Sequence, residues 1–214
     1  MSELEIGSGP TAVTASLHGE EGTLVALGPG AGGNRKTPAL VALAEAIAHS
    51  GRRALLFNFP YRERRRRIPD PPRVLEATIA EVASVAREVL KAPQLVLGGR
   101  SMGGRIASQA VAKGVRAEAL VLLAYPLHPP GKPETLRDAH LKDIQVPMLF
   151  VQGTRDAFAR WDLLTAALAP LESRAELFPI PNGDHSFKVP RAESAGLAER
   201  ITAEVIAFLE RQGL

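Results

Sequence analysis

Apolar and polar positions alternate near the start of the chain. Within TAVTASLHG (11–19), polar residues separate Val13, Ala15 and Leu17, and the Glu-Glu-Gly turn that follows leads into TLVALG (23–28). A period of two on both sides of a tight turn predicts an antiparallel hairpin at the edge of a sheet.

Beyond residue 28, helix-like and strand-like segments alternate. The predicted helices cover residues 37–49, 74–91, 102–113, 162–169 and 196–211. The predicted strands cover residues 53–59, 94–97, 119–123, 147–152 and 175–179. The later strands contain the continuous apolar runs LVLGG, ALVLLAY and MLFVQG, as expected where helices cover both faces of a parallel sheet. The sequence therefore predicts a doubly wound α/β fold whose sheet is mainly parallel, with an N-terminal antiparallel hairpin.

The length of 214 residues suits one well-buried domain, which we expect to span 1–214. No internal repeat or low-complexity linker divides the chain. One connection, residues 126–146, is long, polar and rich in proline. We expect it to form a loop with one short helix, since it is too short for a second domain.

Composition narrows the chemistry. The hydrophobic content of 45% with 23% charged residues is ordinary for a soluble globular protein. No apolar run approaches the roughly 20 residues that cross a bilayer, and the first residues lack the features of a signal peptide. We therefore predict a cytoplasmic protein with no membrane partner. Because there is no cysteine, disulfides, thiolate zinc sites and a cysteine nucleophile are excluded.

The net charge of +3 and the pI near 9.5 would suit a nucleic-acid partner. The excess is concentrated in RERRRR (62–67), however, and the rest of the chain is close to neutral. We therefore expect no nucleic-acid partner.

The segment QLVLGGRSMGGRIASQAVAK (94–113) contains the pattern G-x-S-x-G as GRSMG (99–103). An apolar strand leads into it and an amphipathic helix leads out of it. A sharp turn at this point would expose the Ser101 hydroxyl, and glycines two positions away would avoid clashes between strand and helix. This pattern predicts a serine nucleophile, although a glycine-bounded turn with Ser101 as a helix cap would look the same.

A serine nucleophile needs a base that is held by an acid. Asp156 follows the strand in PMLFVQG, and His185 follows the strand in ELFPI. Both lie at C-terminal strand ends, where open α/β sheets hold their ligands. Asp162 and Asp184 compete with Asp156 for the role of the acid, and either could instead be a helix cap or a turn residue. The remaining histidines are expected to be structural or at the surface: His18, His49, His128 and His140, of which the role of His128 is the most open.

Three motifs carry a family resemblance: GRSMGG (99–104), YPLHPPGKP (125–133) and GDHSF (183–187). With them, essentially the whole chain resembles the α/β-hydrolase superfamily, in its small, capless, dienelactone-hydrolase-like branch. That branch includes a subunit of a eukaryotic histone acetyltransferase complex. The resemblance implies an eight-stranded-type sheet, Ser101, Asp156 and His185 as nucleophile, acid and base, and no metal or organic cofactor. Most members are predicted hydrolases, while at least one lineage serves as an interaction subunit.

The glycine loop GPGAGG (28–33) is compatible with more than one kind of site. A P-loop is excluded because Arg35 stands where its last glycine should be. The loop does satisfy G-x-G-x-x-G, so an NADP site stays an alternative. Against it, Pro29 lacks the N–H that a phosphate would use. In the hydrolase interpretation the loop corresponds to the His-Gly-x-Gly-Gly oxyanion segment, with Pro29 in place of the usual histidine. The backbone N–H groups of Ala31 and Met102 would then form the oxyanion hole.

Substrate access depends on what covers the nucleophile. A lid is usually inserted at the place of the connection 126–146, which is too short here to form one, so we predict an open site. The arginine run follows a strand end, which makes Arg62 and Arg64 candidate contacts for substrate, anionic substrate above all. A solvated charge run is the competing interpretation. His128 is a further candidate for the rim of the site.

The sequence thus predicts a serine hydrolase for a small-molecule carboxylic ester, thioester or lactone. A binding module that keeps the fold without turnover is the alternative, with an NADP-binding protein behind it. The sequence predicts neither the acyl group nor the oligomeric state.

Overall fold

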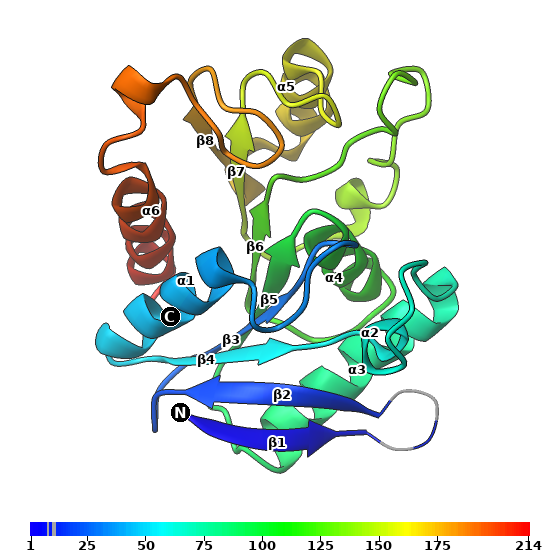
Figure 1. Ribbon diagram of the computed structural model, residues 1–214, viewed down its shortest axis with the longest axis vertical. Coiled ribbons are helices and arrows are strands. Elements are labelled where there is room, and N and C mark those ends of the chain that lie inside the picture. Colours follow the sequence, from blue (N-terminus) through cyan, green and yellow to red (C-terminus); the bar gives the residue numbers. More distant parts are fainter. Residues whose placement is uncertain (8, 10–11) are drawn as a thin grey trace.

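An eight-stranded sheet forms the centre of the computed structural model, which describes residues 1–7, 9 and 12–214 (Figure 1). Along the chain the strands are β1 (Ser2–Ile6), β2 (Val13–His18), β3 (Leu24–Gly28), β4 (Arg53–Phe57), β5 (Leu95–Arg100), β6 (Ala119–Leu123), β7 (Met148–Gly153) and β8 (Ala175–Ile180). Across the sheet their order is β1-β2-β4-β3-β5-β6-β7-β8. β2 runs antiparallel to both of its neighbours, whereas every pairing from β4 to β8 is parallel.

Helices cover both faces of the sheet. The α-helices are α1 (Pro38–His49), α2 (Pro60–Glu63), α3 (Pro72–Glu88), α4 (Met102–Ala112), α5 (Trp161–Leu168) and α6 (Leu197–Arg211), and the 3-10 helices are η2 (Leu141–Asp143), η3 (Ala169–Arg174) and η4 (Arg191–Glu193). α1 and α6 lie on one face, and α3 and α4 lie on the other (Figure 1). α1, α2 and α3 each begin with proline. Proline suits this position because an N–H in the first turn would have no intrahelical partner, and because its fixed φ matches that of a helix.

Neighbouring residues of β4 point to opposite faces, so this strand contributes to two cores. Leu55 and Phe57 pack in the core under α3 and α4, while Ala54 and Leu56 pack in the core under α1 and α6. All four side chains are fully buried. A buried side chain the size of leucine or phenylalanine stabilises a fold by about 1.5–3 kcal/mol, so this two-sided burial explains the unbroken apolar runs of the strands.

The predicted doubly wound α/β fold, its mainly parallel sheet and its N-terminal antiparallel hairpin are confirmed, but the partners predicted for that hairpin are wrong. β2 forms its hairpin with β1, which is absent from the predicted elements, and β4 separates β2 from β3. Ala15 of β2 lies opposite Phe57 of β4, and Ala26 of β3 lies opposite Leu55. Alternation identifies a strand but not its neighbour. The turn between β2 and β3 would also suit a hairpin, although these two strands do not pair.

The connection between β6 and β7 contains the short helix η2 and no inserted cap, as predicted. Tyr125, at its start, donates from its buried hydroxyl to the backbone oxygen of Arg137, 2.6 Å away. Among the described residues, no helix is long and apolar enough to span a membrane.

The chain changes direction across the sheet at β3. From β3 it passes through α1 to β4 on one side, and β5 then pairs with β3 on the other side. In open α/β sheets such a switch leaves a crevice at the carboxyl ends of the two strands, where ligands bind. The glycine loop after β3 and the serine after β5 both lie at this point.

Candidate active site

Ser101 occupies the sharp turn between β5 and α4. Its backbone has φ 51° and ψ −116°, a positive-φ conformation that costs a non-glycine residue on the order of 1–3 kcal/mol. The turn is held by a hydrogen bond from the Ser101 N–H to the Leu123 oxygen, 2.8 Å away. A Cβ at Gly103 would lie 2.2 Å from the Gly28 oxygen, and one at Gly99 would lie equally close. Glycine is therefore required on both sides of Ser101, because β3 packs directly against the turn.

The three side chains singled out by the sequence lie in one hydrogen-bonded line. The Ser101 hydroxyl is 2.8 Å from Nε2 of His185, and Nδ1 of His185 is 2.8 Å from Oδ2 of Asp156. The Asp156 carboxylate is fully buried, while the imidazole keeps 21% of its surface exposed. The line thus runs from a buried anion to a hydroxyl near solvent.

The Asp156 carboxylate has further partners that fix its plane. Gln152 of β7 donates from Nε2 to the same Oδ2, 2.6 Å away, and the Phe158 N–H donates to Oδ1, 2.7 Å away. Among the described residues, the Oε1 atom of buried Gln152 has no hydrogen-bond partner. The carboxylate therefore accepts three hydrogen bonds and has no freedom to rotate away from His185.

Packing and hydrogen bonds hold the His185 ring and its loop. The ring of Phe158 stacks on the imidazole, with centroids 4.2 Å apart and planes 30° apart. Arg100, beside the nucleophile, donates to the His185 backbone oxygen at 3.1 Å. The Asp184 carboxylate accepts from the backbone N–H groups of Ser186 and Lys188, which closes the turn.

The two competing aspartates thus have other partners. Asp184 holds the turn described above. Asp162 lies exposed on the first turn of α5, where hydrogen bonds from Arg160 lower its pKa to about 2. Only Asp156 of these three contacts the ring of His185.

The glycine loop after β3 lies against the serine turn. A Cβ at Gly30 would be 3.6 Å from that of Ser101, so the loop backbone passes at contact distance. The Gly33 N–H donates to the Gly30 oxygen, and the buried Tyr61 hydroxyl donates to the Ala31 oxygen, 2.7 Å away. Among the described residues, no hydrogen bond uses the N–H of Ala31 or of Met102.

A dinucleotide site would need its third glycine to open the helix, so that the pyrophosphate meets the helix N-terminus. Here α1 begins only at Pro38, five residues after Gly33. The NADP interpretation therefore lacks the geometry on which it depends.

Among the expected substrate contacts, His128 is a correction. It is only 3% exposed, its Nδ1 lies 2.8 Å from the Pro129 oxygen, and its Nε2 accepts from the Arg160 N–H at 3.0 Å. Both ring nitrogens are therefore used: Nδ1 within the proline-rich connection, and Nε2 to join it to the segment after Asp156. His128 is a buried structural residue and not a substrate contact at the surface.

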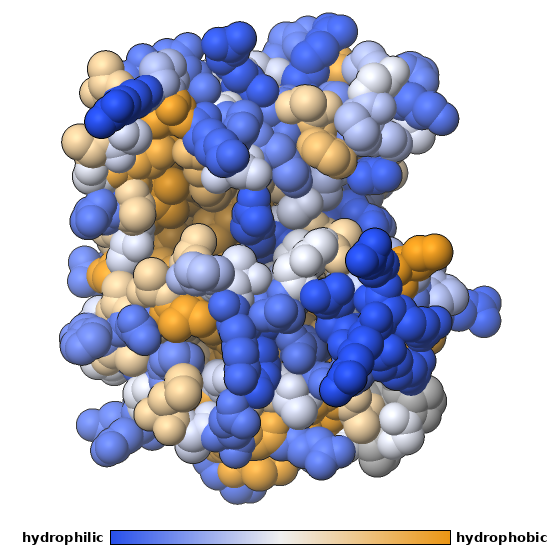
Figure 2. Space-filling model, in the orientation of Figure 1, coloured by the Kyte–Doolittle hydropathy of each residue, from blue (hydrophilic) through white to orange (hydrophobic). Residues whose placement is uncertain are grey.

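The arginine run begins on α2, beside the glycine loop, and polar side chains crowd this region of the surface in Figure 2. Arg62 is half-buried, whereas Arg64–Arg67 are exposed. Arg64 lies 3.7 Å from Asp70, and Arg66 also pairs with that buried carboxylate. Part of the run thus folds back on its own loop, and a substrate role of Arg62 or Arg64 stays a prediction.

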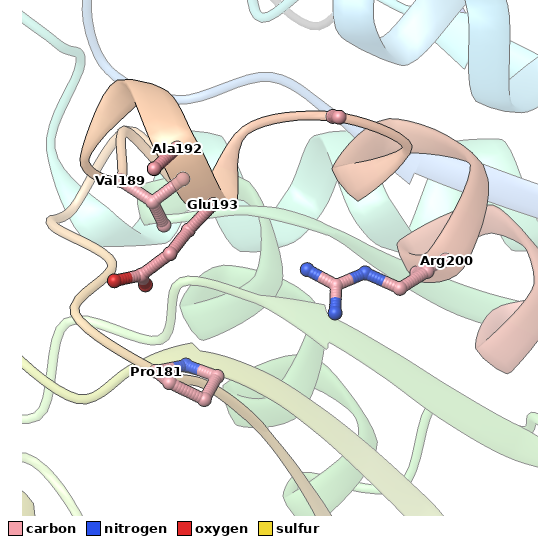
Figure 3. A pocket seen from close by; sticks show the side chains of 6 residues that line it. Pro181, Val189, Ala192, Glu193 and Arg200 are labelled. Carbon is pink, nitrogen blue, oxygen red and sulfur yellow. The ribbon is translucent and has the colours of Figure 1, made fainter.

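A separate pocket of about 320 Å³ lies beside the start of α6 (Figure 3). It is lined by Pro181, Val189, Ala192, Glu193, Ala195 and Arg200, and Arg200 extends from α6 toward its middle. None of its lining residues belongs to the Ser101 line. Among the described residues, no group of three or more metal-ligating side chains comes together.

Residues 21–210 match the family described as alpha/beta hydrolase domain. The chain belongs to this family. Solved structures with the same fold cover almost the entire chain. Est1E from Butyrivibrio proteoclasticus superposes with a TM-score of 0.78 at 16% identity over 99% of both chains. Dienelactone hydrolase from Anabaena variabilis has a TM-score of 0.77 at 17% identity over 98% of this chain and 96% of that one. XC6422 from Xanthomonas campestris, a serine hydrolase without a lid, has a TM-score of 0.74 at 18% identity over 98% and 94%.

The family match and these structures confirm the α/β-hydrolase fold without a cap, and the expected resemblance to its dienelactone-hydrolase-like, lidless members. At such low identities the likeness of the structures concerns the fold alone. Neither the family match nor these structures concern a histone acetyltransferase subunit, so that link stays a prediction.

Several residues of the site were not expected from the sequence. The sequence does contain a clue to Gln152, because it is a polar residue in an otherwise apolar strand. The sequence contains no such clue to Phe158 and Tyr61, because an aromatic residue after a strand is most often part of a core. Their roles depend on partners that only the folded chain brings near.

Proposed function

We propose that the protein is a serine hydrolase that cleaves a carboxylic ester, thioester or lactone through an acyl-enzyme. The observation that carries this proposal is the continuous line from the Ser101 hydroxyl through His185 to buried Asp156, with both contacts at 2.8 Å. The strained backbone of Ser101 supports it further, because such strain is retained where it has a use. Membership of the alpha/beta hydrolase domain family is consistent with a hydrolase.

In the acylation half of the proposed reaction, Oγ of Ser101 attacks the carbonyl carbon while Nε2 of His185 takes its proton. Asp156 holds the Nδ1–H tautomer that leaves Nε2 free to accept, and it stabilises the imidazolium that forms. The tetrahedral intermediate then expels the alcohol, thiol or ring oxygen, which receives the proton from His185. The product of this half is an acyl ester on Ser101.

Deacylation repeats the same steps with water. His185 removes a proton from a water molecule as the water oxygen attacks the acyl carbon. The second tetrahedral intermediate expels Ser101, which recovers its proton from His185, and the carboxylic acid leaves. No step in this scheme calls for a metal or an organic cofactor.

The developing oxyanion needs donors that are in place before the reaction. We assign this role to the backbone N–H groups of Ala31 and Met102, which donate to no other group within the described chain. Met102 is the first residue of α4, where the helix dipole also favours negative charge. Loss of one such donor typically costs about 3–4 kcal/mol of transition-state stabilisation.

Steady-state hydrolysis of p-nitrophenyl esters of graded acyl length tests this function, with Ser101→Ala and His185→Ala as comparisons. We expect turnover by the wild type, and a loss of at least about 10³-fold in kcat for each variant. Turnover that survives in Ser101→Ala would place the chemistry elsewhere. Wild-type protein that is folded but turns over no ester, thioester or lactone would instead support the non-catalytic binding module.

A further inference from the structure

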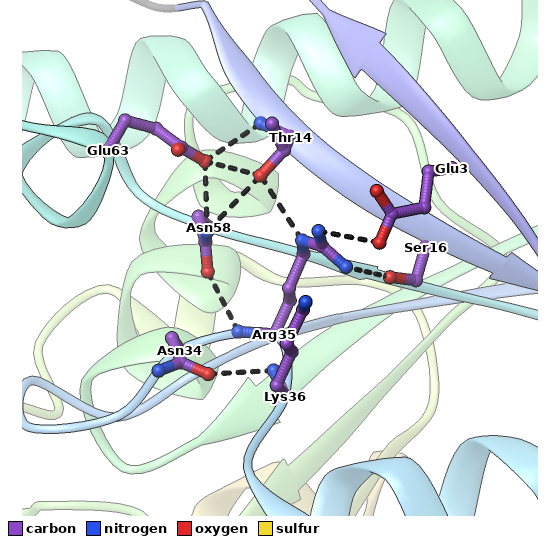
Figure 4. Close-up of polar contacts among 8 residues, drawn as sticks. All are labelled: Glu3, Thr14, Ser16, Asn34, Arg35, Lys36, Asn58 and Glu63. Atoms are coloured by element: carbon purple, nitrogen blue, oxygen red, sulfur yellow. Dashed lines mark hydrogen bonds and ion pairs between the residues drawn. The ribbon is translucent and has the colours of Figure 1, made fainter.

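Two side chains outside the proposed oxyanion loop hold it, one at Ala31 and one at Arg35. The buried Tyr61 hydroxyl donates to the oxygen of Ala31 itself. The Arg35 N–H donates to Oδ1 of Asn58, 2.8 Å away (Figure 4). The bond from the Gly33 N–H to the Gly30 oxygen is the loop's own backbone turn. The position of the Ala31 N–H therefore depends on groups outside the loop.

The second anchor is itself held by a carboxylate. Oε1 of Glu63 accepts from Nδ2 of Asn58 at 2.9 Å, and from the N–H and the hydroxyl of Thr14 at 2.9 and 2.7 Å (Figure 4). Burial alone would raise the pKa of Glu63, but the hydrogen bonds from Thr14 and Asn58 outweigh it, and its pKa is lowered. The charged carboxylate is therefore the form that this cluster favours, and it fixes the amide of Asn58.

The side chain of Arg35 extends the same anchor into the sheet. Its guanidinium donates to the hydroxyl of Thr14, to the hydroxyl of Ser16 and to Oε1 of Glu3, the last at 2.8 Å. Only 8% of this side chain is exposed. A buried charge is costly to leave unpaired, so the guanidinium has few alternative positions. β1 and β2 thereby hold Arg35, two residues after the glycine loop.

One short helix carries the first anchor, Tyr61, and the carboxylate that holds the second. Tyr61 and Glu63 lie on α2, which begins at Pro60, three residues after β4 ends. Asn58 lies in between, at the carboxyl end of the same strand. Because β4 pairs with β3, from which the loop departs, the loop is braced by the strand next to its own.

We infer that Tyr61 and the Asn58–Glu63 pair are positioning residues that hold the Ala31 N–H toward the oxyanion of the reaction; this inference rests on the proposed function. Hydrogen bonds to the oxyanion strengthen as charge develops, so a misplaced donor raises the barrier more than it weakens substrate binding. Loss of either anchor should therefore lower kcat and leave KM nearly unchanged.

Tyr61→Phe tests the first anchor, because it removes one hydroxyl and keeps the ring. Its matched control is Tyr125→Phe, which removes an equally buried hydroxyl that also donates to a backbone oxygen, that of Arg137. We expect kcat on p-nitrophenyl esters to fall at least about tenfold in Tyr61→Phe with KM within about twofold. Tyr125→Phe should show a similar loss of thermal stability with kcat within about twofold of the wild type.

A trifluoromethyl ketone adds an oxyanion-specific readout, because its adduct with Ser101 carries the charge that the loop would stabilise. The inhibition constant of this ketone should rise in Tyr61→Phe by about the factor by which kcat/KM falls. A structural role alone would leave the inhibition constant unchanged in protein that remains folded.

Glu63 tests the second anchor through one oxygen. The three hydrogen bonds that it accepts all end on Oε1, an atom that glutamine retains. We expect Glu63→Gln to keep kcat within about twofold and Glu63→Met, of similar size, to lose at least about tenfold. If Tyr61→Phe does not fold, this pair decides: equal kcat in the two variants overturns the inference.

The proposed function can fail separately. A folded wild type that neither turns over esters nor binds the ketone refutes the function, and the inference falls with it. Wild-type turnover together with an unchanged kcat in folded Tyr61→Phe overturns the inference alone.

Discussion

Replacing Asp156 by asparagine should trap His185 in the wrong tautomer. The carboxylate accepts three hydrogen bonds, from His185 and Gln152 on Oδ2 and from the Phe158 N–H on Oδ1. An asparagine has one acceptor oxygen and one donor NH₂ group. If the oxygen replaced Oδ2, the NH₂ group would face the Phe158 N–H, and two buried donors would meet.

The opposite orientation avoids this clash of donors. The asparagine oxygen then accepts from the Phe158 N–H, and its NH₂ group faces Gln152 and His185. Gln152 can turn its amide, so that its Oε1, now without a partner, accepts a hydrogen bond. His185 must then accept at Nδ1, which leaves the proton on Nε2, pointing at Ser101. The imidazole can no longer take the serine proton.

A tautomer trap of this kind costs about 10⁴-fold in kcat in a serine protease. That factor equals about 5.4 kcal/mol of transition-state stabilisation. We expect the same order of loss for Asp156→Asn on a p-nitrophenyl ester, because the stacked Phe158 ring keeps the imidazole in place. The free energy of unfolding should change by less than about 1.5 kcal/mol, since Gln152 has one buried polar group without a partner both before and after the substitution.

The control is Asp162→Asn, which removes an exposed carboxylate paired with Arg160 and should leave kcat unchanged. Stopped assays with active-site titration would exclude wild-type contamination. If Asp156→Asn retained kcat within tenfold of the wild type, Asp156 would not orient His185 as the structure suggests.

Three further predictions concern the backbone and one half-buried histidine. In Gly103→Ala the new Cβ would meet the Gly28 oxygen at 2.2 Å, so urea denaturation should show a loss of about 3 kcal/mol, against less than about 1 kcal/mol for Gly32→Ala, which has open space. Equal losses in the two variants would refute the close approach. Ser101→Gly should be about 1 kcal/mol more stable than Ser101→Ala, because glycine relieves the strain of φ 51°; a less stable Ser101→Gly would contradict that strain. Burial lowers the pKa of His140 from 6.5, so the stability that its neutral form contributes is present above pH 6.5 and is lost as the pH falls through the lower folded pKa. Between pH 7.5 and 5, the wild type should therefore lose more stability in urea than His140→Gln does, and parallel losses would rule this out.

Local pattern predicted most of the fold and the Ser101 line, for identifiable reasons. Ser101 stands between an apolar strand and an amphipathic helix with glycines at fixed offsets, and each of these signals lies within a few residues of it. Asp156 and His185 each follow a strand end, and parallel strands bring such ends to one edge of the sheet. Chain order and strand direction were therefore enough to place the three side chains near one another.

The unexpected features depend on contacts across long stretches of sequence. Glu63 lies in an arginine run and reads as a solvated charge, yet its partner Thr14 is 49 residues away. His128 resembles a surface residue because prolines, a glycine and a lysine follow it, but Arg160 contacts it from a distant loop. Strand pairing fails for the same reason, since nothing in β2 indicates that β4 lies beside it. Periodicity reports which face of an element is buried, not what lies against that face.

The central claim is that the Ser101 hydroxyl is an activated nucleophile. A fluorophosphonate probe tests it most directly, because stable phosphonylation requires that oxygen to attack phosphorus and expel fluoride. Intact-mass and peptide mass spectrometry under native conditions should find one adduct, on Ser101, in the wild type and none in Ser101→Ala. A folded wild type without an adduct, or an adduct that persists in Ser101→Ala, would contradict the claim.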